Sequence, residues 1–129
     1  MPEGVDTDKN GIRDEIDRML AKKYGTKPEL LQAMRMLYGA YQETLHTKST
    51  NKIDALNIVY RTIDLGSCSG RGIRKQGLNS NNAYDEAMIY TFNTRSRLDA
   101  RKKIFAQAGM IMRSVDDDTI VCPYTDDLK

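Results

Sequence analysis

The sequence predicts an all-α fold, a small bundle of four to five helices that forms a single domain over residues 1–129. Apolar side chains recur at helical spacing in successive segments, and glycine, proline and capping residues lie between these segments. A chain of 129 residues with 40% hydrophobic content can bury one core. No apolar run approaches the roughly 18 residues that read as a membrane span, so we expect none.

The first element is an aspartate-rich run over residues 6–17, which has the spacing of a 12-residue calcium loop. Side-chain oxygens fall at positions 1, 3, 5, 9 and 12 of the run, and a glycine falls at position 6. Calcium takes about six to eight oxygen ligands, and the glycine permits the sharp turn around it. The alternative is a polar leader whose acidic residues only favour a helix start. The candidate ligands are Asp6, Asp8, Asn10, the backbone carbonyl of Ile12, Asp14 and Asp17.

This run resembles EF-hand-like loops, and more closely the aspartate-rich repeats of thrombospondin type 3 and of many secreted bacterial proteins. An ordinary EF-hand has an apolar residue at position 8 and glutamate at position 12, where this chain has Arg13 and Asp17. The resemblance implies a Ca²⁺ site, and the shorter aspartate implies a weak site that also tolerates Mg²⁺. No second loop pairs with the first, so we expect no opening switch of the calmodulin type.

Three amphipathic helices are expected after the loop. The first continues from the loop and stops near Gly25. The second starts in the stretch 26–29, which reads as a capping box with Pro28 in the first turn, and Asn51 is a candidate cap for the third. Their inward-facing residues are Ile12, Ile16, Met19, Leu20 and Tyr24, then Leu30, Met34, Leu37, Tyr38, Tyr41 and Leu45, then Leu56, Val59, Tyr60 and Ile63.

The second half of the chain begins with a predicted long polar loop over residues 66–82. This stretch contains four glycines, three basic residues and three asparagines. A fourth helical segment is expected from near Ala83. Asn93 or Thr94 then caps a final helix that extends to about Met112. Residues 115–129 are expected to form an acidic tail.

Two cysteines lie in polar surroundings, Cys68 and Cys122. A bridge between them would close a loop of about 55 residues and contribute roughly 4 kcal/mol in the chain-entropy model. Two free thiols or a metal site are the alternatives, although the single histidine does not supply the ligand spacing of structural zinc. A disulfide predicts an oxidising compartment, where abundant calcium also fills weak sites.

A broader resemblance is to a group of uncharacterised exported bacterial proteins. The matching pieces are the calcium-type loop, Cys68, the stretch 91–94 with Arg97, and Cys122 followed by Pro123. The resemblance implies a periplasmic or extracellular location. The loop begins close to Met1, so we expect that an export signal has been removed. The group implies no activity.

Basic residues gather between positions 71 and 103, whereas both ends of the chain are acidic. These charges either meet an acidic partner or pair within the fold. A nucleic-acid partner is not expected, because aromatic residues are not interleaved with the basic ones and the acidic ends repel phosphate. The candidate partner-binding residues are Arg71, Arg74, Lys75, Arg97 and Arg101.

The sequence favours a protein without catalytic activity. Its one histidine and two cysteines form no evident catalytic set, and adjacent acids such as Asp85 and Glu86 are usually solvated. We therefore expect an exported calcium-binding module that binds another protein, such as an immunity protein that inhibits a secreted toxin or enzyme. The alternative is a structural domain of the cell envelope in which calcium only adds stability. A hydrolase is the less favoured reading.

Overall fold

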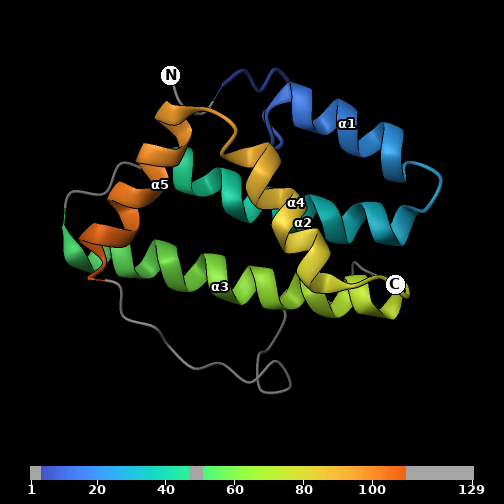
Figure 1. The fold of residues 1–129 in the computed structure, drawn as a ribbon. Coiled ribbons are helices and arrows are strands. Elements are labelled where there is room, and N and C mark those ends of the chain that lie inside the picture. Colours follow the sequence, from blue (N-terminus) through green and yellow to red (C-terminus); the bar gives the residue numbers. More distant parts are fainter. Residues whose placement is uncertain (1–3, 47–50, 110–129) are drawn as a thin grey trace.

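The computed structural model describes residues 4–46 and 51–109, and this part of the chain forms five α-helices (Figure 1). No strand occurs within these two ranges. The predicted all-α bundle of four to five helices is therefore confirmed. The helices are α1 (Asp14–Tyr24), α2 (Pro28–His46), α3 (Lys52–Lys75), α4 (Ser80–Thr91) and α5 (Arg95–Gln107).

Side-chain caps mark the starts of three helices. Asn51 caps α3 and Thr94 caps α5, as the sequence predicts; each side chain accepts a hydrogen bond from the backbone N–H three residues later, at 2.9 and 3.2 Å. Pro28 takes the first position of α2, where its missing N–H costs nothing. α4 starts earlier than expected, because Asn79 provides a cap before Ser80.

The predicted long loop over residues 66–82 is wrong, because α3 continues through most of it to Lys75. Gly70 lies where this helix is packed most closely: a side-chain carbon added there would sit 2.0 Å from Tyr84 Oη. Glycine at this position lets α4 approach α3, and the packing outweighs the low helix propensity of glycine. The chain turns at Gly77, whose φ of 82° is a left-handed conformation that suits glycine.

The helix α2 is the centre of the fold and contacts each of the other four helices. Two apolar clusters fill the interior. The larger one joins α1, α2, the end of α3 and α4. The smaller one joins the first half of α3 to α5. The fully or nearly buried members include Leu20, Leu30, Met34, Leu37, Tyr38 and Ile73 in the first cluster, and Ala55, Val59, Ile104 and Ala108 in the second.

The C-terminal predictions fall outside the described residues. Residues 115–129 and Cys122 are not among them. Cys68 lies buried within α3, with 1% of its surface exposed, and not in the polar loop that the sequence predicts. The bridge to Cys122 stays a prediction. Among the described helices, none combines the length and apolar character that crossing a membrane requires.

Candidate metal-binding loop

The loop before α1 is held in a tight turn by its own polar side chains. Gly11 has a φ of 87° and Lys9 a φ of 54°, so the backbone passes twice through the left-handed region. The Gly11 N–H donates to Asp6 Oδ2 at 2.9 Å, and the Ile12 N–H donates to Asn10 Oδ1 at 3.0 Å. The glycine at position 6 of the motif therefore makes the turn that the sequence predicts.

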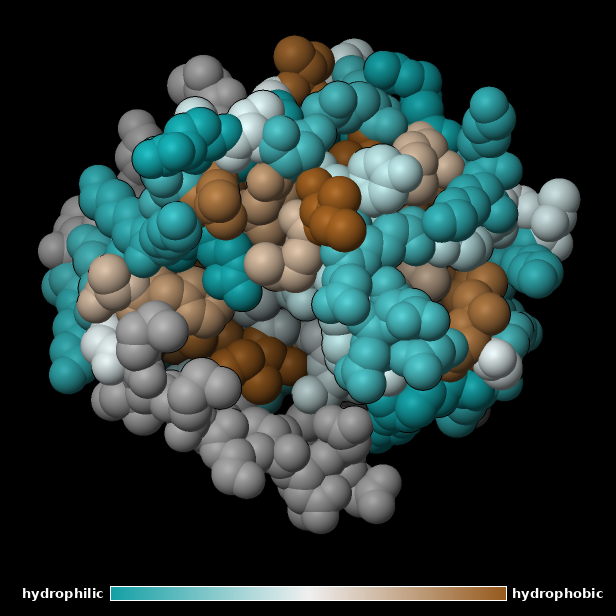
Figure 2. Space-filling view, in the orientation of Figure 1, coloured by the Kyte–Doolittle hydropathy of each residue, from teal (hydrophilic) through white to brown (hydrophobic). Residues whose placement is uncertain are grey.

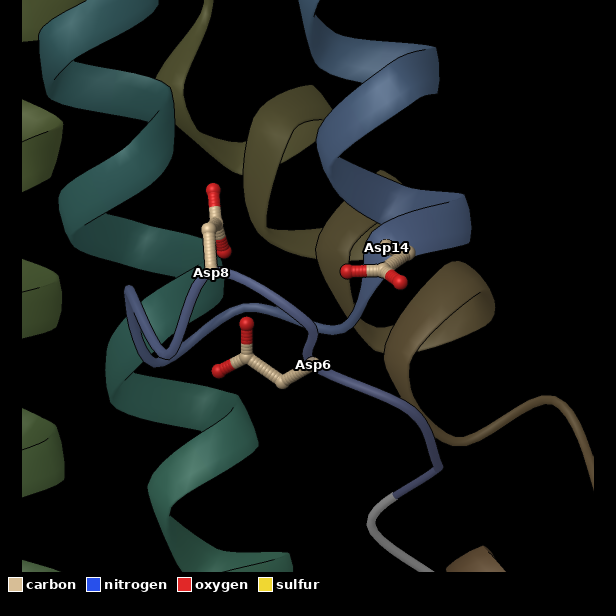
Figure 3. Close-up of side chains that lie close together, drawn as sticks. All are labelled: Asp6, Asp8 and Asp14. Carbon is tan, nitrogen blue, oxygen red and sulfur yellow. The ribbon is translucent and has the colours of Figure 1, made fainter.

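Three of the predicted ligands converge around this turn. Asp6, Asp8 and Asp14 each offer a carboxylate oxygen, and these three oxygens lie within 4.8 Å of one another. Figure 3 shows Asp6 and Asp8 on the loop and Asp14 at the start of α1. Asp14 is fixed to the loop by its backbone N–H, which donates to the carbonyl of Val5 at 2.7 Å.

The pKa values of two carboxylates in this cluster, Asp8 and Asp14, are shifted in opposite directions. Partial desolvation and a hydrogen bond shared with the Asp6 carboxyl raise the pKa of Asp8. The Thr7 hydroxyl and backbone N–H, which donate to Asp14 at 2.6 and 2.9 Å, lower the pKa of Asp14. Asp6 Oδ1 is buried and accepts no hydrogen bond from the described residues. Crowded carboxylates with an unsatisfied oxygen fit a hard divalent cation, Ca²⁺ or Mg²⁺.

Two other predicted ligands, Asn10 and Asp17, make contacts of their own. The Asn10 side-chain amide donates to Asp17 Oδ2, so positions 5 and 12 of the motif are bonded to each other. Asp17 Oδ1 also lies 3.6 Å from Nε of Arg35 on α2. The side chain of Ile12 is buried in the larger apolar cluster, and its backbone carbonyl stays a predicted ligand. The described geometry thus brings together positions 1, 3 and 9 of the motif.

Arg13 is the residue of the loop whose structural role sequence reasoning missed. Only 1% of it is exposed, and its guanidinium donates to backbone and side-chain oxygens far along the chain. Nη1 donates to Gln42 Oε1 at 3.1 Å and to the carbonyl of Thr91 at 3.0 Å. Nη2 donates to the carbonyl of Tyr90 and to Asn93 Oδ1. Arg13 therefore satisfies terminal carbonyls of α4 and fastens the loop to α2 and to the α4–α5 junction.

A signal for this role was present in the motif. An ordinary EF-hand has an apolar residue at position 8, and this chain has Arg13 there, next to the buried Ile12. An arginine at an inward-facing position must find acceptors, because a buried guanidinium without partners is costly. Glu15 supplies one acceptor, 2.6 Å from Nε of Arg13. The remaining acceptors lie too far away in sequence for the motif to reveal them.

The five predicted partner-binding residues do not form one surface. Arg71, Arg74 and Lys75 lie near the end of α3, whereas Arg97 and Arg101 lie on α5, which packs against the first half of α3 (Figure 1). Arg74 and Lys75 are exposed and Arg71 is half-buried. Nη1 of Arg74 donates to the Ser80 hydroxyl across the turn between α3 and α4, at 3.0 Å.

The two predicted contact residues on α5 face the protein more than the solvent. The Arg97 side chain is 14% exposed, and its Nη1 lies 2.7 Å from Asn93 Oδ1 and 3.6 Å from Glu15 Oε1. Arg101 lies over the rings of Phe92 and Phe105. Both side chains therefore take part in contacts within the fold.

A hollow of about 440 Å³ lies beside the loop, between α2 and α3. Asn10, Gly11 and Ile12 form one of its walls. The cations at its rim are paired with carboxylates: Arg35 faces Asp17, and Arg61 donates to Glu43 at 3.0 Å. Its shape thus depends on the conformation of the loop.

Comparison with known proteins assigns no family to this chain. Models of protein families, curated proteins and solved structures were compared, and none matches. The likeness to EF-hand-like loops therefore rests on residues 6–17 alone. Function has to be argued from the geometry of the described residues.

Proposed function

We propose that the loop over residues 6–17 binds a calcium ion. The observation that carries this proposal is the convergence of Asp6, Asp8 and Asp14 around the left-handed turn at Gly11. A divalent cation would neutralise carboxylates that otherwise repel one another. Magnesium is the second candidate, because both ions take carboxylate oxygens and the sequence motif implies a weak site.

The metal would stabilise more than the loop. Asp14 begins α1, and Arg13 next to it donates to groups on α2, on α4 and at the α4–α5 junction. An ion that fixes the loop also fixes the position of Arg13. Because the unfolded chain lacks this arrangement, calcium binding favours the folded state.

The first test compares thermal and calorimetric data for the Asp8→Ala variant and the unchanged protein, both stripped of metal by a chelator. At a calcium concentration of about 100 times the dissociation constant, the unchanged protein should gain roughly 2.7 kcal/mol of unfolding free energy. Asp8→Ala should lose most of this gain, because it removes one of the three converging carboxylates. A parallel titration with magnesium identifies the preferred ion.

Asp85→Ala is the matched control, since Asp85 is an exposed carboxylate on α4 and is not part of the aspartate cluster. It should keep the full calcium response. Equal stabilisation of the Asp8→Ala variant by calcium would show that the ligands are misassigned. Absence of heat and of any melting shift in the unchanged protein at millimolar calcium would leave the run as a polar helix leader.

We further propose that the calcium-ordered chain is a non-enzymatic module that binds another protein outside the cytoplasm, in the periplasm or beyond. An inhibitor of a secreted toxin or enzyme is one form of this role. Two observations support it: the carboxylate cluster suits the millimolar calcium of such compartments, and the loop forms a wall of the hollow between α2 and α3. Calcium would thereby shape a surface for contact.

A structural domain of the cell envelope is the second candidate. Arg13 is buried and donates hydrogen bonds to α2 and α4, so a metal bound in the loop would stabilise contacts between helices. This favours the alternative. Calcium would then raise stability without serving a partner.

Affinity capture from a periplasmic extract, with calcium and with chelator, separates the two candidates. A stoichiometric partner that is held with calcium, released by chelator and lost in the Met36→Glu variant supports the binding module, since Met36 lines the hollow beside the loop. Lys102→Glu, an exposed change on α5, is the control that should retain the partner. Capture of no stoichiometric partner favours the structural role.

A further inference from the structure

A second hollow, of about 300 Å³, opens between the four helices α2, α3, α4 and α5. Tyr41, Tyr84 and Phe105 contribute aromatic walls, and Arg101 contributes the single charged side chain of the lining that the structure describes. Figure 2 shows an opening on this face with apolar side chains at its edge, between the segments labelled α3, α4 and α5 in Figure 1. This site is distinct from the metal-binding loop.

The space exists because α3 presents small residues to it. Gly66 lines the hollow and is itself buried, yet a side-chain carbon added there would meet nothing within 4 Å. Open space next to a buried backbone position is the mark of a cavity. Tyr84 spans the gap and donates from its hydroxyl to the carbonyl of Gly66 at 3.0 Å, which fixes the ring as a wall.

Arg101 is a cation without a carboxylate partner among the described residues. Its guanidinium carbon lies 4.2 Å from the ring centroid of Phe105 and 5.3 Å from that of Phe92. Its Nε donates only to Met88 Sδ, a weak acceptor, at 3.4 Å. Burial lowers the pKa of Arg101, because desolvation disfavours the charged guanidinium.

The arginines at the two hollows differ in whether a carboxylate lies next to them. Both arginines at the rim of the hollow beside the loop face carboxylates, Arg35 with Asp17 and Arg61 with Glu43. The buried Arg13 has Glu15 and several backbone carbonyls. Arg101 differs from these three arginines: it is a partly desolvated guanidinium that faces an apolar space and retains unused donors. Such a group favours an anionic ligand.

We propose that this hollow binds a small organic anion that carries one carboxylate on a flat apolar body. The carboxylate would accept two hydrogen bonds from the planar Arg101 guanidinium. The body would lie between the rings of Tyr41, Tyr84 and Phe105. One unpaired cation balances one negative charge, and about 300 Å³ is the lower end of the range for small-molecule sites, which suits a compound of one or two rings.

The experiment uses 2-naphthoate as the probe and 2-naphthamide as its neutral counterpart, with the full-length protein in calcium-containing buffer. Saturable calorimetric binding and NMR shifts at Gly66, Tyr84 and Phe105 are expected for the naphthoate. The amide should bind about tenfold more weakly or worse, because it forgoes a charge-assisted hydrogen bond. Arg101→Gln should weaken naphthoate binding to a similar degree, whereas the control Arg95→Gln, at an exposed arginine of the same helix, should change nothing.

A second variant keeps the test decisive if Arg101→Gln fails to fold. Gly66→Leu places an aliphatic side chain into the open space and leaves every charge in position, so it should abolish naphthoate binding while the chain stays folded. Equal affinity for naphthoate and naphthamide, shifts at another location, or unchanged binding by Gly66→Leu would each overturn the proposal. Calcium binding does not enter this test, so its failure leaves the metal proposal standing.

Discussion

At the scale of single residues, Arg13 stabilises the ends of two helices, the start of α1 through its backbone and the end of α4 through its side chain. Its backbone forms the N-cap position of α1, and its carbonyl accepts from the Asp17 N–H at 3.1 Å. Its side chain supplies donors to the last carbonyls of α4, which have no partner within that helix. Removing the guanidinium would take away the donor that these two carbonyls share.

The Arg13→Ala change should therefore lower the free energy of unfolding by about 3 kcal/mol, because it removes a buried side chain together with the donor to the last carbonyls of α4. Chemical denaturation in chelator measures this loss without any contribution from metal. Arg18→Ala, at an exposed arginine of the same helix, should stay within about 0.5 kcal/mol of the unchanged protein. Similar stability of the two variants would contradict the role given to Arg13.

At the scale of helices, Glu86 joins α1, α2 and α4. Its carboxylate accepts from the Tyr24 hydroxyl at 2.9 Å and from the Tyr38 hydroxyl at 3.0 Å, and it lies 3.1 Å from Nζ of Lys23. Asp85 and Glu86 are adjacent in the sequence, but their side chains lie in different environments. Asp85 is exposed, while Glu86 is a structural acceptor between three helices.

This junction predicts a loss of stability in alkali. Burial, together with the nearby Glu86 charge, raises the pKa of Tyr38, and burial with the Glu86 hydrogen bond raises that of Tyr24. The folded state thus keeps protons that the unfolded chain releases near pH 10. The unfolding free energy should fall above this pH, by about 1.4 kcal/mol per pH unit for each such tyrosine. Urea denaturation from pH 8 to 11 measures the slope, which Tyr38→Phe should reduce; parallel curves would refute the assignment.

Two glycines of α3 provide a matched pair for testing how the helices pack. Gly66→Ala should raise the unfolding free energy by about 0.5–1 kcal/mol, because the added methyl group enters open space and alanine favours the helix. Gly70→Ala should lower it by about 1–3 kcal/mol, because the methyl group would collide with Tyr84 Oη. Thermal denaturation of both variants is sufficient, and changes of the same sign would contradict the described contact between α3 and α4.

At the scale of the whole molecule, helix caps and turns can be predicted from neighbouring residues, whereas contacts between residues far apart in the sequence cannot. The sequence predicts Asn51 as a cap and Asn93 or Thr94 as the next one, because a cap depends on the next three residues. The turn at Gly11 followed from the spacing of the motif. The continuation of α3 was missed because Gly70 is explained only by Tyr84, which approaches from another helix. The partners of Arg13 were missed for the same reason, and so was the position of Arg101 over Phe105.

The reach of Arg13 also bears on how the chain is made. Its acceptor at Thr91 lies 78 positions further along the sequence. A ribosome synthesises the loop first, yet the groups that hold the guanidinium emerge only after most of the protein has been translated. The hydrogen bonds from Arg13 to the carbonyls of Tyr90 and Thr91 can form only after α4 has been synthesised. The hydrogen bonds of Arg13 to α4 therefore belong to the class of long-range contacts that local structure alone cannot form.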